Sequence, residues 1–316
     1  MDDPNVTYIT FDAYVEMQKY RYLYFVIMLS AFVTILYSNG TVVYVIYAHE
    51  NLHQPMYVFI AALLVNSLLY STAVYPKLLV DSLSDRQVIT YPVCLFQWFM
   101  FYSFGGSEFL LLAVMAYDRY LAICKPLQYS AIMRRRTVGI FLAVSWFLPF
   151  CCNAAAVALS ARQKLCRFSI NGILCSSTVH SLHCQDSNHT LRVAMSAYGL
   201  VLLFHLVVLS LVLILFSYIR ILLVSYQSSK EVRRKAAQTC LPHLMILINF
   251  SCLCSYDVIL AKAKIHVSRT TQLIMTFQVI MYHPLFNPFV YGLKMKEISK
   301  HLSAHFHLEP QLNASV

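Results

Sequence analysis

The chain has 316 residues, of which 59% are hydrophobic and only 12% are charged, and its mean hydropathy is +0.61. A soluble domain carries about 25% charged residues, so this composition excludes an ordinary soluble domain and favours a protein that crosses a membrane several times. The net charge of +10 points to nucleic acid only in a soluble basic domain, and no such domain is visible. Nucleic acid is therefore not an expected partner.

Seven apolar stretches are long enough to cross a bilayer as helices, which takes about 20 residues each. They lie near residues 22–48, 57–80, 92–124, 138–160, 193–226, 235–261 and 270–293. The expected fold is an all-α membrane protein, a seven-transmembrane helix bundle over 22–293. Residues 1–21 form an N-terminal segment that is acidic and polar at its start, without the pattern of a cleavable signal peptide. In the tail, 294–316, the stretch KMKEISKHLSAHF (294–306) predicts a short amphipathic helix on the membrane surface.

The third span carries an ionisable residue, Glu108, at membrane depth. Helical spacing places it on the same face as Arg119, almost three turns further on, and Gly105-Gly106 permits close approach of a neighbouring helix. An ionisable group at this depth indicates a functional site. In a functional site, Glu108 is protonated, binds a cation or hydrogen-bonds a polar neighbour. The alternative is that Glu108 belongs to a structural polar network. The expected network comprises Asn39, Asn66, Ser67, Glu108 and Asn287.

Asp118 and Arg119 stand side by side where the third apolar span ends. A partly desolvated acid beside a guanidinium can act as a latch that opens when another group competes for the arginine. The alternative is an ordinary anchor at the membrane interface.

Four cysteines lie in or beside polar segments on one side of the membrane: Cys94, Cys166, Cys175 and Cys184. Four cysteines allow three pairings, and the spacing does not choose among them. We expect disulfides that fix the long loop from Ser160 to Arg192, and neither a metal nor another cofactor. The alternative is a metal site that these cysteines form with His180, His183 and His189.

Charge and modification signals predict the orientation of the chain. The basic clusters MRRRT (133–137) and KEVRRK (230–235) share one side, as expected for the cytoplasmic face with its anionic lipid. The other side carries the cysteine-rich loop and the glycosylation sequons at Asn5 and Asn188. We therefore expect a plasma-membrane protein with an extracellular N-terminus.

The stretch MAYDRYLAICKPLQY (115–129) resembles the hallmark of odorant receptors, within the rhodopsin-like G-protein-coupled receptors. Five further stretches resemble this family in the same order along most of the chain. They are Asn39-Gly40, LHQPMY (52–57), Pro76-Lys77, KAAQTCLPHL (235–244) and PLFNPFVYGLKMKEI (284–298). The sequence of residues 60–79, IAALLVNSLLYSTAVYPKLL, most resembles the fish-type branch of this family.

The resemblance implies a role for each matching residue. Arg119 would engage the G protein, with Asp118 as its resting partner and Tyr120 beside it. The remaining switch residues are Lys235 and His243 on the sixth helix, and Asn287, Pro288 and Tyr291 on the seventh. The implied disulfides are Cys94–Cys175 and Cys166–Cys184. The implied activity is not enzymatic: a small odorant or water-borne solute would activate a heterotrimeric stimulatory G protein and raise cyclic AMP in olfactory cilia.

The chain departs from the family pattern at two places. Ser67 occupies the position of an inward-facing aspartate, so a sodium site shared with Glu108 lacks one of its carboxylates. Phe250-Ser251-Cys252 stands where the family has Phe-Tyr-Gly, and Tyr256 is the alternative aromatic.

Ligand sites in helix bundles lie between the helices and are mostly apolar. The candidate ligand residues are Phe101, Tyr102, Gly105, Tyr198, Leu202, His205, Tyr256, Asp257 and Gln272. Asp257, with Lys262 and Lys264, suits a charged or zwitterionic solute, or else caps the sixth helix outside the pocket. His205 is interpreted as a buried, hydrogen-bonded core residue or as a ligand contact.

Two other functions are alternatives to that of an odorant receptor. A rhodopsin-like receptor for another small ligand has the same sequence features, so the sequence does not separate it from the first. A transporter or channel would favour internal repeats, paired broken helices or a buried charge relay, and the sequence has no visible repeat.

Overall fold

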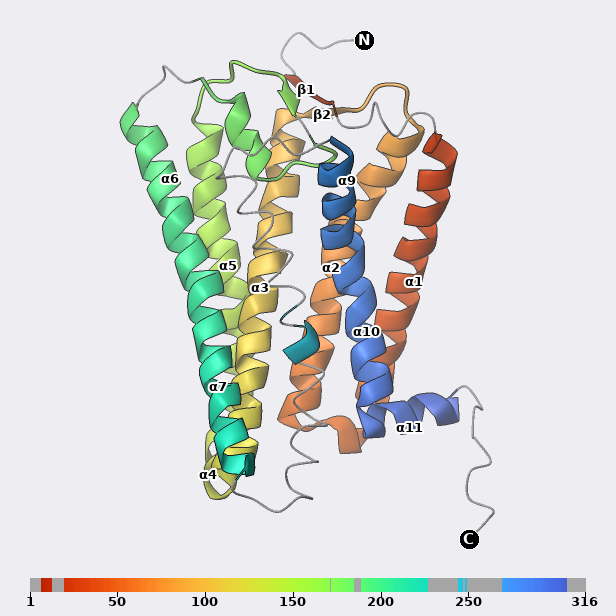
Figure 1. Cartoon of the computed structure of the whole chain (residues 1–316), viewed down its shortest axis with the longest axis vertical. Helices are drawn as coiled ribbons and strands as arrows, with labels where there is room; N and C mark the ends of the chain where they lie inside the picture. Colours follow the sequence, from red (N-terminus) through yellow and green to blue (C-terminus); the bar gives the residue numbers. More distant parts are fainter. Residues whose placement is uncertain are drawn as a thin grey trace.

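The computed structural model describes residues 7–12, 20–170, 172–184, 189–226, 244–246, 248 and 269–305, and these are mainly helical. The long helices run side by side, with β1 and β2 at one end and α11 lying across the other (Figure 1). We call these the sheet end and the α11 end. The predicted sixth span, 235–261, lies outside the described residues except for 244–246 and 248.

Four long helices are continuous: α1 (Arg21–Ala48), α2 (Pro55–Leu83), α3 (Tyr91–Cys124) and α5 (Arg135–Ala161). Two further spans contain a π-helical turn. One consists of α6 (His189–Leu203), the turn η5 (Phe204–Val208) and α7 (Leu209–Tyr226), and the other of α9 (Arg269–Phe277), the turn η6 (Gln278–Tyr282) and α10 (His283–Lys294). Within the described ranges, six helices are long and apolar enough to cross a membrane.

Short elements connect the long helices. They are the 3₁₀ turns η3 (Glu50–Leu52) and η4 (Ser177–Leu182), the helix α4 (Pro126–Ile132) and the terminal helix α11 (Lys296–His305). The apolar face of α11 packs inward, with Ile298 fully buried. Gly292 of α10 makes room for this contact, because a Cβ there would lie 3.2 Å from Leu302 Cδ1.

Among the described residues, the hydrophobic core forms two clusters, one toward each end of the bundle. On four helices, buried polar residues fall between these clusters along the chain. This polar layer contains Asn39 of α1, Asn66, Ser67 and Ser71 of α2, Ser103, Ser107 and Glu108 of α3, and His283 and Asn287 of α10. A buried polar side chain is costly unless it is hydrogen-bonded, so the contacts inside this layer influence how the helices fit together.

The sheet end carries three short strands, which the sequence analysis did not predict. They are β1 (Tyr8–Phe11), β2 (Val88–Thr90) and β3 (Ser169–Ile170), in the order β2-β1-β3. β1 pairs antiparallel with β2, with Ile9 opposite Ile89, and parallel with β3, with Phe11 opposite Ile170. The N-terminal strand therefore joins the start of α3 to the long loop.

Candidate functional site

Asp118 and Arg119, the two residues of the predicted latch, are in contact in the structure. Arg119 Nε donates to Asp118 Oδ2 at 3.0 Å, and Arg119 Nη2 contacts the same oxygen. The Asp118 side chain is fully buried and that of Arg119 is 14% exposed. Tyr129, which lies within the hallmark stretch but was not singled out, donates its hydroxyl to Asp118 Oδ1 at 2.8 Å. Burial and the nearby carboxylate raise the pKa of Tyr129, so its hydroxyl remains a donor.

Other predicted switch residues lie near Arg119 on α3 or on α10. Tyr120 is half-buried and stacks on Tyr117, with ring centroids 6.3 Å apart. Pro288 lies inside α10, and Tyr291, one turn further on, is fully buried. Lys235 and His243 lie outside the described residues.

Glu108 is bound by two residues of the last span. His283 Nδ1 lies 2.8 Å from Glu108 Oε1, and Asn287 Nδ2 donates to the same oxygen at 3.0 Å. Asn287 Nδ2 also lies 3.0 Å from Ser67 Oγ. Ser67, Glu108 and Asn287 of the predicted network thus meet. His283 was not predicted, because a lone histidine before a proline carries no motif.

The two other members of the predicted network bond elsewhere. Asn66 donates to the Phe104 carbonyl at 3.0 Å and accepts from Trp146 Nε1 at 3.2 Å. Asn39 donates to the Pro284 carbonyl at 2.9 Å. These amides tie α2 to α3 and α5, and α1 to α10.

Two disulfides hold the long loop at the sheet end, Cys94–Cys175 and Cys166–Cys184. These are the pairs that the family resemblance implied. The Cys175 backbone N–H also donates to the buried Gln97 Oε1 at 2.9 Å. The loop is therefore fixed to α3 by a covalent bond and an adjacent hydrogen bond.

His183 packs the loop against the start of α3. Its Nε2 lies 3.2 Å from the Tyr91 hydroxyl. Burial, with a smaller contribution from nearby His180, lowers the pKa of His183 from 6.5 to about 4. The folded loop therefore favours a neutral imidazole, which shares a hydrogen bond with the Tyr91 hydroxyl, while that hydroxyl donates to the Ser160 carbonyl at 3.1 Å.

This lowered pKa predicts how the loop responds to acid. The contribution of neutral His183 is complete above about pH 6.5, and it is lost as the pH falls toward 4, because the unfolded chain binds the proton first. We expect the midpoint of thermal unfolding of the purified receptor to fall between pH 7 and pH 5. The variant His183→Gln keeps a side chain that can form a hydrogen bond but does not titrate, so its unfolding midpoint should fall less over this pH range. Equal pH dependence of the two proteins would contradict this assignment.

The candidate ligand residues of α3 lie in a column of aromatic rings. Phe101 and Tyr102 are half-buried, and the Phe101 ring lies 5.6 Å from that of Tyr70 on α2. Trp98 contacts Tyr102 at 6.4 Å and His180 of the loop at 5.3 Å between ring centroids. The column therefore reaches from the bundle interior to the loop. Tyr70 and Trp98 were missed by sequence reasoning.

The two adjacent glycines of α3 differ in their surroundings. A Cβ on Gly105 would meet nothing within 4 Å, so this position is open. A Cβ on Gly106 would lie 3.0 Å from Pro149 Cβ and 3.3 Å from Leu206 Cδ1. Gly106 therefore provides the close helix approach, while Gly105 leaves space beside the aromatic column.

The candidates on the fifth span differ from expectation. The Tyr198 hydroxyl donates to the Cys152 carbonyl at 2.9 Å and ties α6 to α5, while Leu202 is half-buried. His205 is exposed, and its Nδ1 bonds the Val201 carbonyl of its own helix at 2.9 Å. The interpretation of His205 as a buried core residue is therefore wrong. Because this span is apolar on all sides, its sequence does not identify the face that turns outward.

The remaining candidates cannot be placed. Tyr256, Asp257, Asn5 and Asn188 lie outside the described residues, and the structure describes only the backbone of Gln272, in α9.

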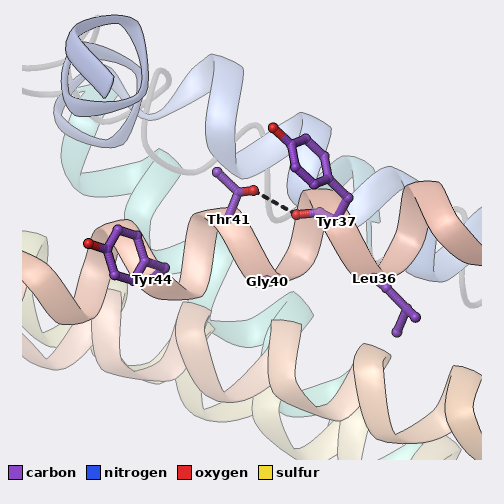
Figure 2. A pocket seen from close by; sticks show the side chains of 5 residues that line it. All are labelled: Leu36, Tyr37, Gly40, Thr41 and Tyr44. Atoms are coloured by element: carbon purple, nitrogen blue, oxygen red, sulfur yellow. Dashed lines mark hydrogen bonds between the residues drawn. The ribbon is translucent and has the colours of Figure 1, made fainter. Parts of the chain in front are cut away.

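A surface groove on α1 is separate from this site. It is lined by Leu36, Tyr37, Gly40, Thr41 and Tyr44, and Figure 2 shows the Thr41 hydroxyl bonded to the Tyr37 carbonyl. Tyr37 and Tyr44 are 63% and 57% exposed. All five residues come from one helix, so the groove is open and does not enclose a solute.

Comparison with solved structures identifies the fold of the chain. The crystal structure of squid rhodopsin matches with a TM-score of 0.74 at 17% sequence identity, over 92% of this chain and 86% of that one. The chain therefore has the seven-helix bundle fold of rhodopsin.

Sequence comparison identifies the family. The family model for the olfactory receptor matches residues 26–308. Olfactory receptor 2AG1 of Homo sapiens is 35% identical over 87% of both chains, and olfactory receptor 2B6 of Mus musculus is 32% identical over 87% of this chain and 86% of its own. The chain belongs to the olfactory receptor family, and it is a multi-pass membrane receptor rather than an enzyme.

Proposed function

We propose that this receptor binds a small odorant or water-borne solute between its helices near the sheet end, and activates a G protein at the α11 end. The G protein would be a heterotrimeric, stimulatory, olfactory-type protein that raises cyclic AMP. The observation that carries this proposal is the contact of Arg119 with the buried Asp118, which Tyr129 reinforces. It is a releasable ion pair at the opposite end from the aromatic column.

We place the sheet end outside the plasma membrane of olfactory cilia. The disulfides at this end suit an oxidising compartment, and so do the sequons at Asn5 and Asn188. Arg134, Arg135 and Arg136 are exposed at the start of α5, where they can bind anionic lipid of the cytoplasmic leaflet. The N-terminus would then be extracellular.

The proposed mechanism couples the two ends through α3 and the last span. A solute would bind beside Phe101, Tyr102 and Gly105, with Leu202 facing it from the fifth span. Its binding would favour a conformation in which Arg119 leaves Asp118 and contacts the G protein. The other switch residues would be Asn287, Pro288 and Tyr291, with Lys235 and His243 at the cytoplasmic end of the sixth helix.

A cyclic-AMP screen in transfected cells tests both the function and the ligand class. The panel compares amino acids, bile salts, nucleotides and volatile odorants. A charged or zwitterionic ligand would implicate Asp257 with Lys262 and Lys264, whereas a volatile apolar ligand would implicate the aromatic column and Gln272. A concentration-dependent rise that untransfected cells lack would support the proposal.

The variant Phe101→Ala tests the position of the pocket. Removing the ring from the half-buried column deletes apolar contact area, so we expect the concentration for half-maximal response to rise about tenfold or more. Phe147→Ala, which removes the same kind of ring from a side chain of α5 that is 71% exposed, is the matched control. Equal potency of Phe101→Ala and the wild type would place the ligand elsewhere.

A further inference from the structure

The contact between Glu108 and His283 joins α3 to α10 near the middle of the bundle. The two side chains are 8% and 5% exposed, and their polar atoms lie 2.8 Å apart. A hydrogen bond to a carboxylate is stronger than one between neutral groups, and a low-dielectric interior strengthens it further. This contact is therefore a strong candidate for fixing the position of α10.

The backbone hydrogen-bond pattern of the helix changes on both sides of His283. The π turn η6 ends at Tyr282, directly before His283, and Pro288 lies five residues further along the same helix. A π turn changes the hydrogen-bond pattern, and a proline removes one N–H donor. Residues 283–287 form the piece of α10 between these two points, and side-chain contacts influence where this piece lies.

Glu108 contacts both ends of that piece. His283 at its start and Asn287 at its end converge on the same oxygen, Glu108 Oε1. Asn287 also bonds Ser67 of α2, so three helices meet there. The same structure has Arg119 bound to Asp118, so this arrangement belongs to the conformation with a closed latch.

We propose that His283 is a positioning residue that holds α10 against Glu108 in the resting receptor, and that activation breaks this contact. The inference rests on the proposed G-protein function, and it adds a residue that lies outside the hallmark motifs. A receptor without the imidazole would lose a contact of the resting state only, so its population would shift toward the active state without any agonist.

Matched variants separate this role from simple packing. His283→Ala removes the contact. His283→Asn keeps an N–H donor at nearly the same place as Nδ1 but has no imidazole. Glu108→Gln keeps the shape of the side chain and replaces its carboxyl group with an amide.

The first measurement is basal cyclic AMP without agonist, divided by the amount of receptor at the cell surface. We expect about a tenfold increase for His283→Ala, a smaller increase for Glu108→Gln, and a value near that of the wild type for His283→Asn. Unchanged basal activity of His283→Ala, or equal basal activity of the Ala and Asn variants, would overturn the proposal.

The second measurement does not require a G protein. Thermal unfolding of the four proteins in a double-mutant cycle of Glu108→Gln and His283→Ala should show non-additive effects, because the first variant weakens and the second removes the same contact. Additive effects would mean that the pair does not couple the helices. If the wild type raises no cyclic AMP with any agonist, the proposed function fails, while this cycle still decides whether the contact exists.

Discussion

Arg119→Ala is expected to abolish the cyclic-AMP response to agonist while leaving delivery to the cell surface intact. The guanidinium lies at the α11 end and is held only by Asp118 among the hydrogen bonds described for it. Its removal deletes the group that we assign to the G-protein contact but leaves the apolar packing of α3 in place. We expect the maximal response to fall at least about tenfold, measured as cyclic AMP per surface receptor.

Two further variants test the latch itself. Arg119→Lys keeps the charge but loses the planar fork of donors, so we expect a partial response. Tyr129→Phe removes only the hydroxyl that donates to Asp118, so we expect higher basal activity with an intact maximal response. A full response from Arg119→Ala would refute the assigned role of the arginine.

Loss of the bridge between Cys94 and Cys175 is expected to block surface expression. This disulfide closes 81 residues of chain, whereas Cys166–Cys184 closes 18. A disulfide typically stabilises a fold by about 2–4 kcal/mol, and the loop-length dependence makes the longer closure about 1 kcal/mol stronger. We therefore expect Cys94→Ser and Cys175→Ser to reduce surface biotinylation more than Cys166→Ser or Cys184→Ser.

Cys151→Ser provides the control for this series. Cys151 is an exposed free cysteine of α5, so its replacement should leave surface expression unchanged. Normal surface expression of both Cys94→Ser and Cys175→Ser would count against a structural need for the bridge.

Much of the fold could be predicted because membrane helices have a strong compositional signal. Long apolar stretches of the sequence correspond to α1, α2, α3 and α5, and the helical repeat brought Glu108 into a buried layer. The short strand β1 has no comparable signal. Its four residues form a strand only through partners that lie far away in the sequence, beginning at Val88 and Ser169.

Predictions of individual contacts were limited by what a single sequence contains. Asn66 and Asn287 were both possible partners of Glu108, and helical spacing could not show that only Asn287 reaches it. His283 was missed because its importance depends on the neighbouring helix. The buried interpretation of His205 was wrong because both faces of its helix are apolar, so hydrophobicity alone does not tell the inner face from the outer.

The central position of β1 has a practical consequence for engineering. Deleting residues 8–11, or inserting an epitope tag among them, would expose the facing edges of β2 and β3, whose backbone groups would then be open to pairing with other chains. Such a receptor would aggregate or be retained in the secretory pathway for reasons unrelated to ligand recognition. A tag should therefore be attached ahead of this strand through a flexible spacer.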